Sequence, residues 1–71
     1  MAVPHRVDVR DMLCAQALAV VAQAAARLPR GGALEIAYNT DDVERDLRAW
    51  ARERGWAVAA PGAGMLRVVR G

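Results

Sequence analysis

Hydrophobic and polar residues follow two different spacings along this chain. In residues 6–10 and 33–38 they alternate, which is typical of a strand with one buried face. In two longer stretches the hydrophobic residues recur every three or four positions, as on an amphipathic helix. Two further short stretches after the second helix also favour strands. The pattern therefore predicts strand, helix, strand, helix, strand and strand, at residues 6–10, 15–28, 33–38, 41–54, 56–60 and 65–69.

The first predicted helix has one apolar stripe and a clear end. Its stripe consists of Leu18, Val21, Ala25 and Leu28, spaced three, four and three residues apart. Alanine, which is abundant in this stretch, is the strongest helix former. The Pro-Arg-Gly-Gly sequence at residues 29–32 is expected to stop the helix.

The second predicted helix has signals at both ends. Asp41 and Glu44 have the spacing of a capping box, and Gly55 is a typical C-terminal stop. We expect Trp50, at helical spacing from Leu47, to face the core. Trp56 comes after the stop, where an aromatic side chain can belong to a partner surface.

The order βαβαββ predicts an α/β fold. Two helices on one face of a four-stranded mixed sheet make a two-layer α/β sandwich. The crossovers through the helices should be right-handed, and the last two strands should form an antiparallel hairpin. The 71 residues are expected to form one domain, residues 1–71, with residues 1–5 as a flexible N-terminal tail.

Composition bears on the compartment and on possible partners. A single cysteine cannot form an internal disulfide, which favours a reducing, cytoplasmic location. No signal peptide is visible, and the longest apolar run, residues 17–22, is too short to span a membrane. The net charge is +2, and all ten basic residues are arginines that lie among carboxylates. This dispersion indicates a solvated surface rather than a nucleic-acid interface.

Cys14 is the residue most suited to chemistry, because it lies where the first strand region passes into the first helix. The positive end of a helix dipole and its unpaired N–H groups favour a thiolate, the reactive form of cysteine. A nearby Asp11 carboxylate would raise the pKa of the thiol and Arg10 would lower it, so the direction of the net shift stays open. The alternative is that Cys14 is only a small buried hydrophobic residue.

The sequence predicts neither a metal site nor a cofactor. One histidine, His5, and one cysteine cannot supply the four ligands of a structural zinc site. The glycine pair Gly31-Gly32 fits a helix stop, and no phosphate-binding loop motif is present.

The order of elements, the length and the lone cysteine resemble the TusA/SirA-type sulfur carriers. That family has Asp-x-Arg-Gly-x-x-Cys-Pro-x-Pro at the first strand–helix junction, and this chain has Asp8, Arg10 and Cys14 in the same register. The resemblance extends from Arg6 to the C-terminus. Two further stretches match the family, Leu28-Pro29-x-Gly31 and Arg45-Asp46-Leu47-x-x-Trp50.

Several positions depart from the family pattern. Asp11 replaces the glycine of the motif, and Ala15 and Ala17 replace both of its prolines. Two more prolines of the family are replaced, by Asp41 and Arg48. The chain therefore resembles a divergent member of the family that keeps the cysteine of the signature without its prolines.

The resemblance implies a sulfur carrier, a sulfurtransferase in which Cys14 accepts sulfane sulfur as a persulfide. Arg10 and the N–H of Ala15 would stabilise the anion, and Asp8 would order the turn. The implied partners are a sulfur-donor protein of the cysteine desulfurase or rhodanese type and an acceptor protein, and we expect a monomer. The alternative is a non-catalytic binding or regulatory module with Cys14 as a relic, which the lost prolines favour. A nucleic-acid-binding variant of this scaffold ranks third.

Overall fold

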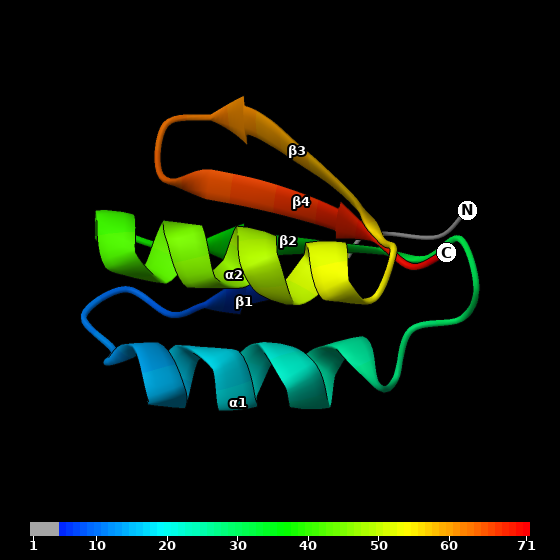
Figure 1. Cartoon of the computed structure of the whole chain (residues 1–71), viewed down its shortest axis with the longest axis horizontal. Coiled ribbons are helices and arrows are strands. Elements are labelled where there is room, and N and C mark those ends of the chain that lie inside the picture. Colours follow the sequence, from blue (N-terminus) through cyan, green and yellow to red (C-terminus); the bar gives the residue numbers. More distant parts are fainter. Residues whose placement is uncertain (1–4) are drawn as a thin grey trace.

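The computed structural model describes residues 5–71 and contains all six predicted elements. Figure 1 shows their arrangement. Their bounds, in chain order, are β1 (His5–Asp8), α1 (Cys14–Ala25), β2 (Ala33–Ala37), α2 (Asp41–Glu53), β3 (Ala57–Gly62) and β4 (Met65–Val69).

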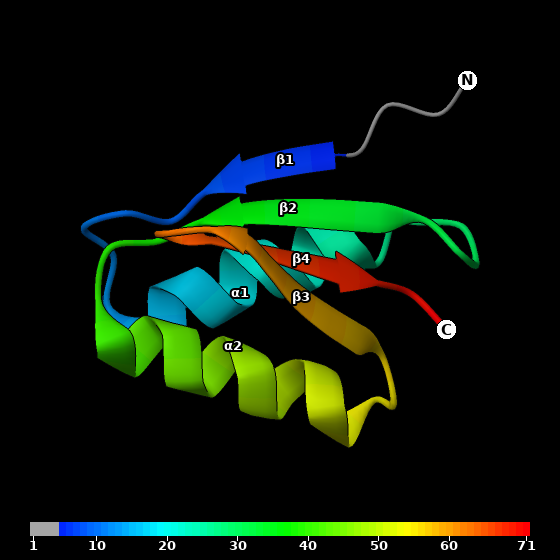
Figure 2. The same ribbon diagram turned by 90° about the horizontal axis from the view of Figure 1, so that it is seen from above.

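The four strands form one mixed sheet in the order β1-β2-β4-β3. β1 pairs with β2 in parallel, whereas β4 pairs antiparallel with both β2 and β3. Both helices lie on one face of this sheet (Figure 2). The two-layer α/β sandwich and the closing hairpin are therefore confirmed.

The core lies between the two layers. Its fully buried side chains come from α1, β2, α2, β4 and the segments after β1 and α1, whereas β1 and β3 contribute only the partly buried Val7 and Val58. Alternation along β2 and β4 turns every second side chain toward the helices, and the two sets meet in register, Leu34 beside Val68 and Ile36 beside Leu66. The fully buried residues are Val9, Ala17, Val21, Ala25, Leu28, Leu34, Ile36, Val43, Leu47, Ala51, Leu66 and Val68.

Two residues expected in the core lie at its margin. Ala17 is buried in α1, whereas Leu18 is only partly buried and lines a hollow on the side of α2. Trp50 is also partly buried, and its ring meets that of Trp56 edge-on at 5.3 Å between centroids. An indole is large, so it packs over the edge of a core this thin instead of inside it.

The cap of α2 differs from the prediction. The capping residue is Thr40, whose side-chain oxygen accepts a hydrogen bond from the Val43 N–H at 3.3 Å. Asp41 is the first helical residue, and with Asp42 and Glu44 it places negative charge at the positive end of the helix dipole. Asp41 therefore does not cap the helix, which begins one residue earlier than a capping box at Asp41 requires.

Other boundaries also differ from the predicted ones, by one to three residues. His5, assigned to an N-terminal tail, is the first residue of β1; the rest of that tail lies outside the described residues. α1 ends at Ala25 because the N–H groups of Arg27 and Leu28 bond three residues back and tighten the last turn. β3 continues through Pro61 and Gly62, where a turn was expected, because a bulge in its pairing with β4 accommodates a proline without an N–H.

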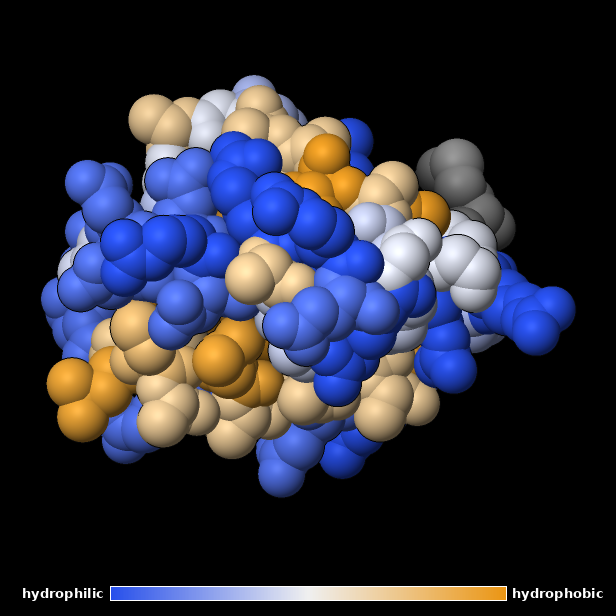
Figure 3. All heavy atoms as spheres, in the orientation of Figure 1, coloured by the Kyte–Doolittle hydropathy of each residue, from blue (hydrophilic) through white to orange (hydrophobic). Residues whose placement is uncertain are grey.

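No helix among residues 5–71 is long and apolar enough to cross a membrane. Along the face shown in Figure 3, hydrophilic side chains gather over α2, while the surface along α1 is mostly apolar. This contrast follows from the sequence of α1, which contains no charged residue.

Candidate functional site

Cys14 is the first residue of α1 and is partly exposed. The first hydrogen bond of the helix runs from the Ala17 N–H to the Leu13 carbonyl at 2.9 Å. Within residues 5–71, the N–H groups of Cys14, Ala15 and Gln16 have no acceptor, as is usual for a first helical turn. These groups and the helix dipole give the site an electropositive backbone suited to an anion.

The helix begins one residue earlier than predicted, at Cys14 instead of Ala15. A proline at position 15 would disfavour the helical conformation of the residue before it. Alanine imposes no such limit, so Cys14 joins the helix and Leu13 becomes the capping residue. Leu13 has no side-chain acceptor and is 75% exposed, and Gln16 satisfies its N–H through Oε1 at 3.3 Å.

The charged side chain that meets the thiol comes from α2. A hydrogen bond to Asp46 is the largest cause that raises the pKa of Cys14 above its ordinary value, followed by partial burial and the negative charges of Asp46 and Asp42. Arg45 opposes them and lowers the pKa. The sequence left the direction of this pKa shift open, and the structure gives an upward shift, because a carboxylate near the thiol favours its neutral form.

Sequence reasoning missed Asp46 as a neighbour of Cys14. The two residues are far apart in the chain, but α1 and α2 both follow strands of the same direction and begin at the same end of the sheet (Figure 1). A polar residue in the first turns of α2 is therefore a candidate neighbour for the first turn of α1. The match of Arg45-Asp46-Leu47 to the family was the available signal.

Asp8 and Arg10 bind each other. Asp8 Oδ1 accepts hydrogen bonds from the main-chain N–H and the Nε of Arg10, both at 3.0 Å, and Oδ2 accepts one from Nη2 at 2.7 Å. Arg10 lowers the pKa of Asp8 to about 2 by these bonds. The structure thus shows Arg10 engaged by Asp8, and Arg45 is the cation that acts on the thiol.

Asp11 takes the place of the family glycine and keeps a glycine-like backbone. Its φ of 65° lies in the left-handed region, which aspartate tolerates better than most residues. Asn39 stabilises it from the loop before α2: the Asp11 N–H donates to Asn39 Oδ1 at 3.0 Å, and Asn39 Nδ2 donates to Asp11 Oδ1 at 2.7 Å. These two bonds join the loops that precede the two helices and fix the start of α1 relative to α2.

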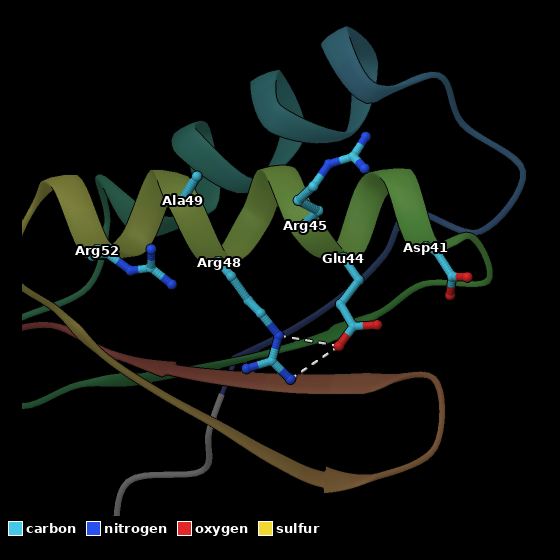
Figure 4. Close-up of a pocket in the computed structure, with 6 residues that line it drawn as sticks. All are labelled: Asp41, Glu44, Arg45, Arg48, Ala49 and Arg52. Carbon is cyan, nitrogen blue, oxygen red and sulfur yellow. Dashed lines mark hydrogen bonds and ion pairs between the residues drawn. The ribbon is translucent and has the colours of Figure 1, made fainter.

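Two hollows on the surface of the helix layer are lined by residues other than Cys14. The one drawn in Figure 4 is lined by Asp41, Glu44, Arg45, Arg48, Ala49 and Arg52, all on α2. Another, between the helices, is lined by Leu18, Asp46, Ala49, Trp50 and Glu53. Cys14 lines neither; it is partly exposed and packs partly against the core.

No group of three His, Cys, Asp or Glu residues in the described part of the chain is placed to hold a metal ion. The chemistry available at the site is that of one thiol, one carboxylate and three main-chain N–H groups. This set can bind an anionic sulfur species and exchange it by nucleophilic attack.

Comparison with known proteins gives one family. The family model described as Sulfurtransferase TusA matches residues 5–69, which include every element and Cys14. No curated protein matches the chain.

Proposed function

Because the chain belongs to the TusA sulfurtransferase family, we propose that it is a sulfur carrier that holds sulfane sulfur as a persulfide on Cys14 and passes it to an acceptor protein. The observation that carries the proposal is the position of the only thiol. Cys14 is partly exposed at the first turn of α1, beside three main-chain N–H groups that have no acceptor among residues 5–71, in a chain that matches the family over nearly its whole length.

In the proposed reaction, the Cys14 thiolate attacks the terminal sulfur of a persulfide on a donor protein. A sulfur–sulfur bond forms to Cys14, the bond within the donor persulfide breaks, and the donor cysteine leaves as a thiolate. The same exchange passes the sulfur from Cys14 to a cysteine of the acceptor. The N–H groups of Ala15 and Gln16 are suited to stabilise the anionic persulfide.

Asp46 lowers the reactivity of Cys14 when no partner is bound. The carboxylate raises the pKa of the thiol, so a smaller fraction of Cys14 is the nucleophilic thiolate than in an unperturbed cysteine. A donor protein that places a cation near Asp46 would remove this effect on docking. We propose a donor of the cysteine desulfurase or rhodanese type, and a reducing compartment such as the cytoplasm, where Cys14 stays free to accept sulfur.

The second candidate is a non-catalytic binding or regulatory module on the same scaffold. The raised pKa of Cys14 favours it, together with the absence of the signature prolines. Such a module would keep the fold and its partner surface without loading sulfur.

Intact-protein mass spectrometry separates the two candidates. The protein is incubated with a cysteine desulfurase and cysteine, or with a rhodanese and thiosulfate. The proposal predicts a gain of one sulfur atom that reducing agents remove and that Cys14→Ser abolishes. Serine is close to cysteine in size and Cys14 is partly exposed, so this variant should remain folded by circular dichroism. No gain under conditions that load another family member would support the binding module.

A further inference from the structure

β3 is an outer strand of the sheet, and one of its sides is open. Within residues 5–71 it pairs only with β4. The run Ala57-Val58-Ala59-Ala60 has no charged side chain, and only Val58 is partly buried. An open strand without charges can accept another strand, and proteins usually protect such edges with charged residues.

The opposite edge of the sheet shows this protection. β1 carries Arg6 and Asp8, and Arg6 is bound to Glu35 of the neighbouring strand at 3.0 Å. On β3, protection begins only at the bulge and Pro61. Residues 57–60 are thus the part of the sheet where a strand can add.

A groove follows β3 on the helix side of the sheet. It has a volume of about 480 Å³ and is lined by Arg48, Arg52, Gly55, Trp56 and Val58. The hollow drawn in Figure 4 adjoins it through Arg48 and Arg52, which line both. In that view Arg48 extends from α2 toward the strands.

The groove is positively charged. Its lining contains two arginines and no carboxylate. Arg48 is bound to Glu44 at 2.9 Å, whereas Arg52 forms no ion pair within the described residues. A carboxylate that entered beside β3 would therefore meet an unpaired guanidinium, which binds carboxylates through two parallel hydrogen bonds.

We propose that residues 57–60 bind an extended, acidic segment of a partner protein, which adds to the sheet beside β3 and pairs a carboxylate with Arg52. Side chains alternate along a strand, and Val58 faces the helix layer with its neighbour Val68. Every second side chain of the added strand would likewise enter the groove. This is the main-chain mode of peptide recognition, in which alternate side chains give specificity.

The charge of the groove selects this occupant over a second copy of the chain. Two copies joined through their β3 strands would bring two arginine-lined grooves without carboxylates close together, and their like charges would repel each other. The proposed docking requires no thiol, so it is independent of sulfur transfer by Cys14.

The test is an NMR titration of the protein with a blocked synthetic peptide of alternating valine and glutamate. Binding should shift the amide signals of residues 57–60 and the indole signal of Trp56, and should slow hydrogen exchange at β3. Two control peptides are matched in length: one with lysine in place of glutamate, and one with N-methyl groups on alternate residues, which cannot form the main-chain bonds. We expect neither control to bind.

Variants locate the charge contact. Arg52→Glu should weaken peptide binding by about fivefold or more. Loss of an exposed ion pair accounts for up to about fivefold, and the new negative charge would add repulsion. Arg30→Glu makes the same charge change at an exposed residue outside the groove and should bind nearly as the parent does. Cys14→Ser should bind unchanged. Absence of binding at millimolar peptide, equal binding of the lysine or N-methyl peptide, or equal weakening by both arginine variants would overturn the proposal.

Discussion

At Cys14, the backbone and the side chains act on the thiol in opposite directions. The first turn of α1 offers a positive dipole end, which favours a thiolate. Asp46 and Asp42 oppose it, and the hydrogen bond to Asp46 is the largest cause in the raised pKa. The carboxylates outweigh the dipole because they carry full negative charges, whereas the helix dipole acts only as partial charges.

Asp46→Asn should lower the pKa of Cys14. The substitution removes the neighbouring negative charge that stabilises the neutral thiol, so the thiolate forms at lower pH. The rate of alkylation by iodoacetamide, measured from neutral to alkaline pH, should rise at lower pH than in the parent protein. Glu53→Gln removes the same charge from α2 at a residue that does not affect Cys14, and should leave the profile in place. Coincident profiles for Asp46→Asn and the parent would rule out the contact.

At the scale of elements, the start of α1 is set by the absence of proline. Cys14 is helical because Ala15 permits it, and the Ala15 N–H makes no hydrogen bond in the described structure. Asp11 and Asn39 fix the preceding loop by two reciprocal bonds. The junction therefore has a left-handed backbone at Asp11 and a helical Cys14.

Ala15→Pro should shorten α1 by one residue without breaking it. No hydrogen bond is lost, but the proline disfavours the helical conformation of Cys14. We expect the free energy of unfolding to change by less than about 1 kcal/mol and the alkylation profile of Cys14 to move to lower pH as the thiol leaves Asp46. Urea unfolding and alkylation measure the two effects.

Ala17→Pro is the matched control, because the Ala17 N–H donates the first bond of the helix and the residue is buried. Loss of this hydrogen bond and the clash of the proline ring should lower the free energy of unfolding by about 3 kcal/mol or more. If Ala17→Pro destabilised the protein as little as Ala15→Pro does, α1 would have to begin later than Cys14.

At the scale of the whole molecule, stability depends on a thin core between one sheet and two helices. The apolar residues of the sheet side come chiefly from β2 and β4, the two central strands. Alanine fills several core positions on the helices, so α1 packs close to the sheet. Each larger buried side chain therefore contributes a large share of the stabilisation from the core. A small domain has a total stability of only about 5 kcal/mol at the low end of the usual range.

Leu34→Ala should remove a large part of the free energy of unfolding. The side chain is fully buried on β2, and such a truncation costs about 2–5 kcal/mol. Leu13→Ala makes the same change at a side chain that is 75% exposed and should alter the unfolding free energy by less than about 0.5 kcal/mol. Urea unfolding followed by tryptophan fluorescence compares them. Similar midpoints for the two variants would contradict the core described here.

The sequence alone predicted the order and type of the elements, the main core positions and the location of Cys14 at a strand–helix junction. These features are local, since hydrophobic spacing and stop signals act within a few residues of where they occur. The family resemblance rested on the same local motifs and was confirmed over residues 5–69. Element boundaries were less accurate because caps and bulges depend on single side chains, as at Thr40 and Pro61.

Only the tertiary structure decided the chemistry around the thiol. Asp46 approaches Cys14 because two helices begin at the same end of the sheet, and Asp11 is held by Asn39 from a loop 28 residues away. Likewise, Arg6 and Arg67 meet at Glu35 across three strands. Contacts of this kind depend on how the elements pack, and hydrophobic spacing within one element carries no information about charges on another. The chain thus encodes locally where its thiol lies, and through its packing how readily that thiol loses its proton.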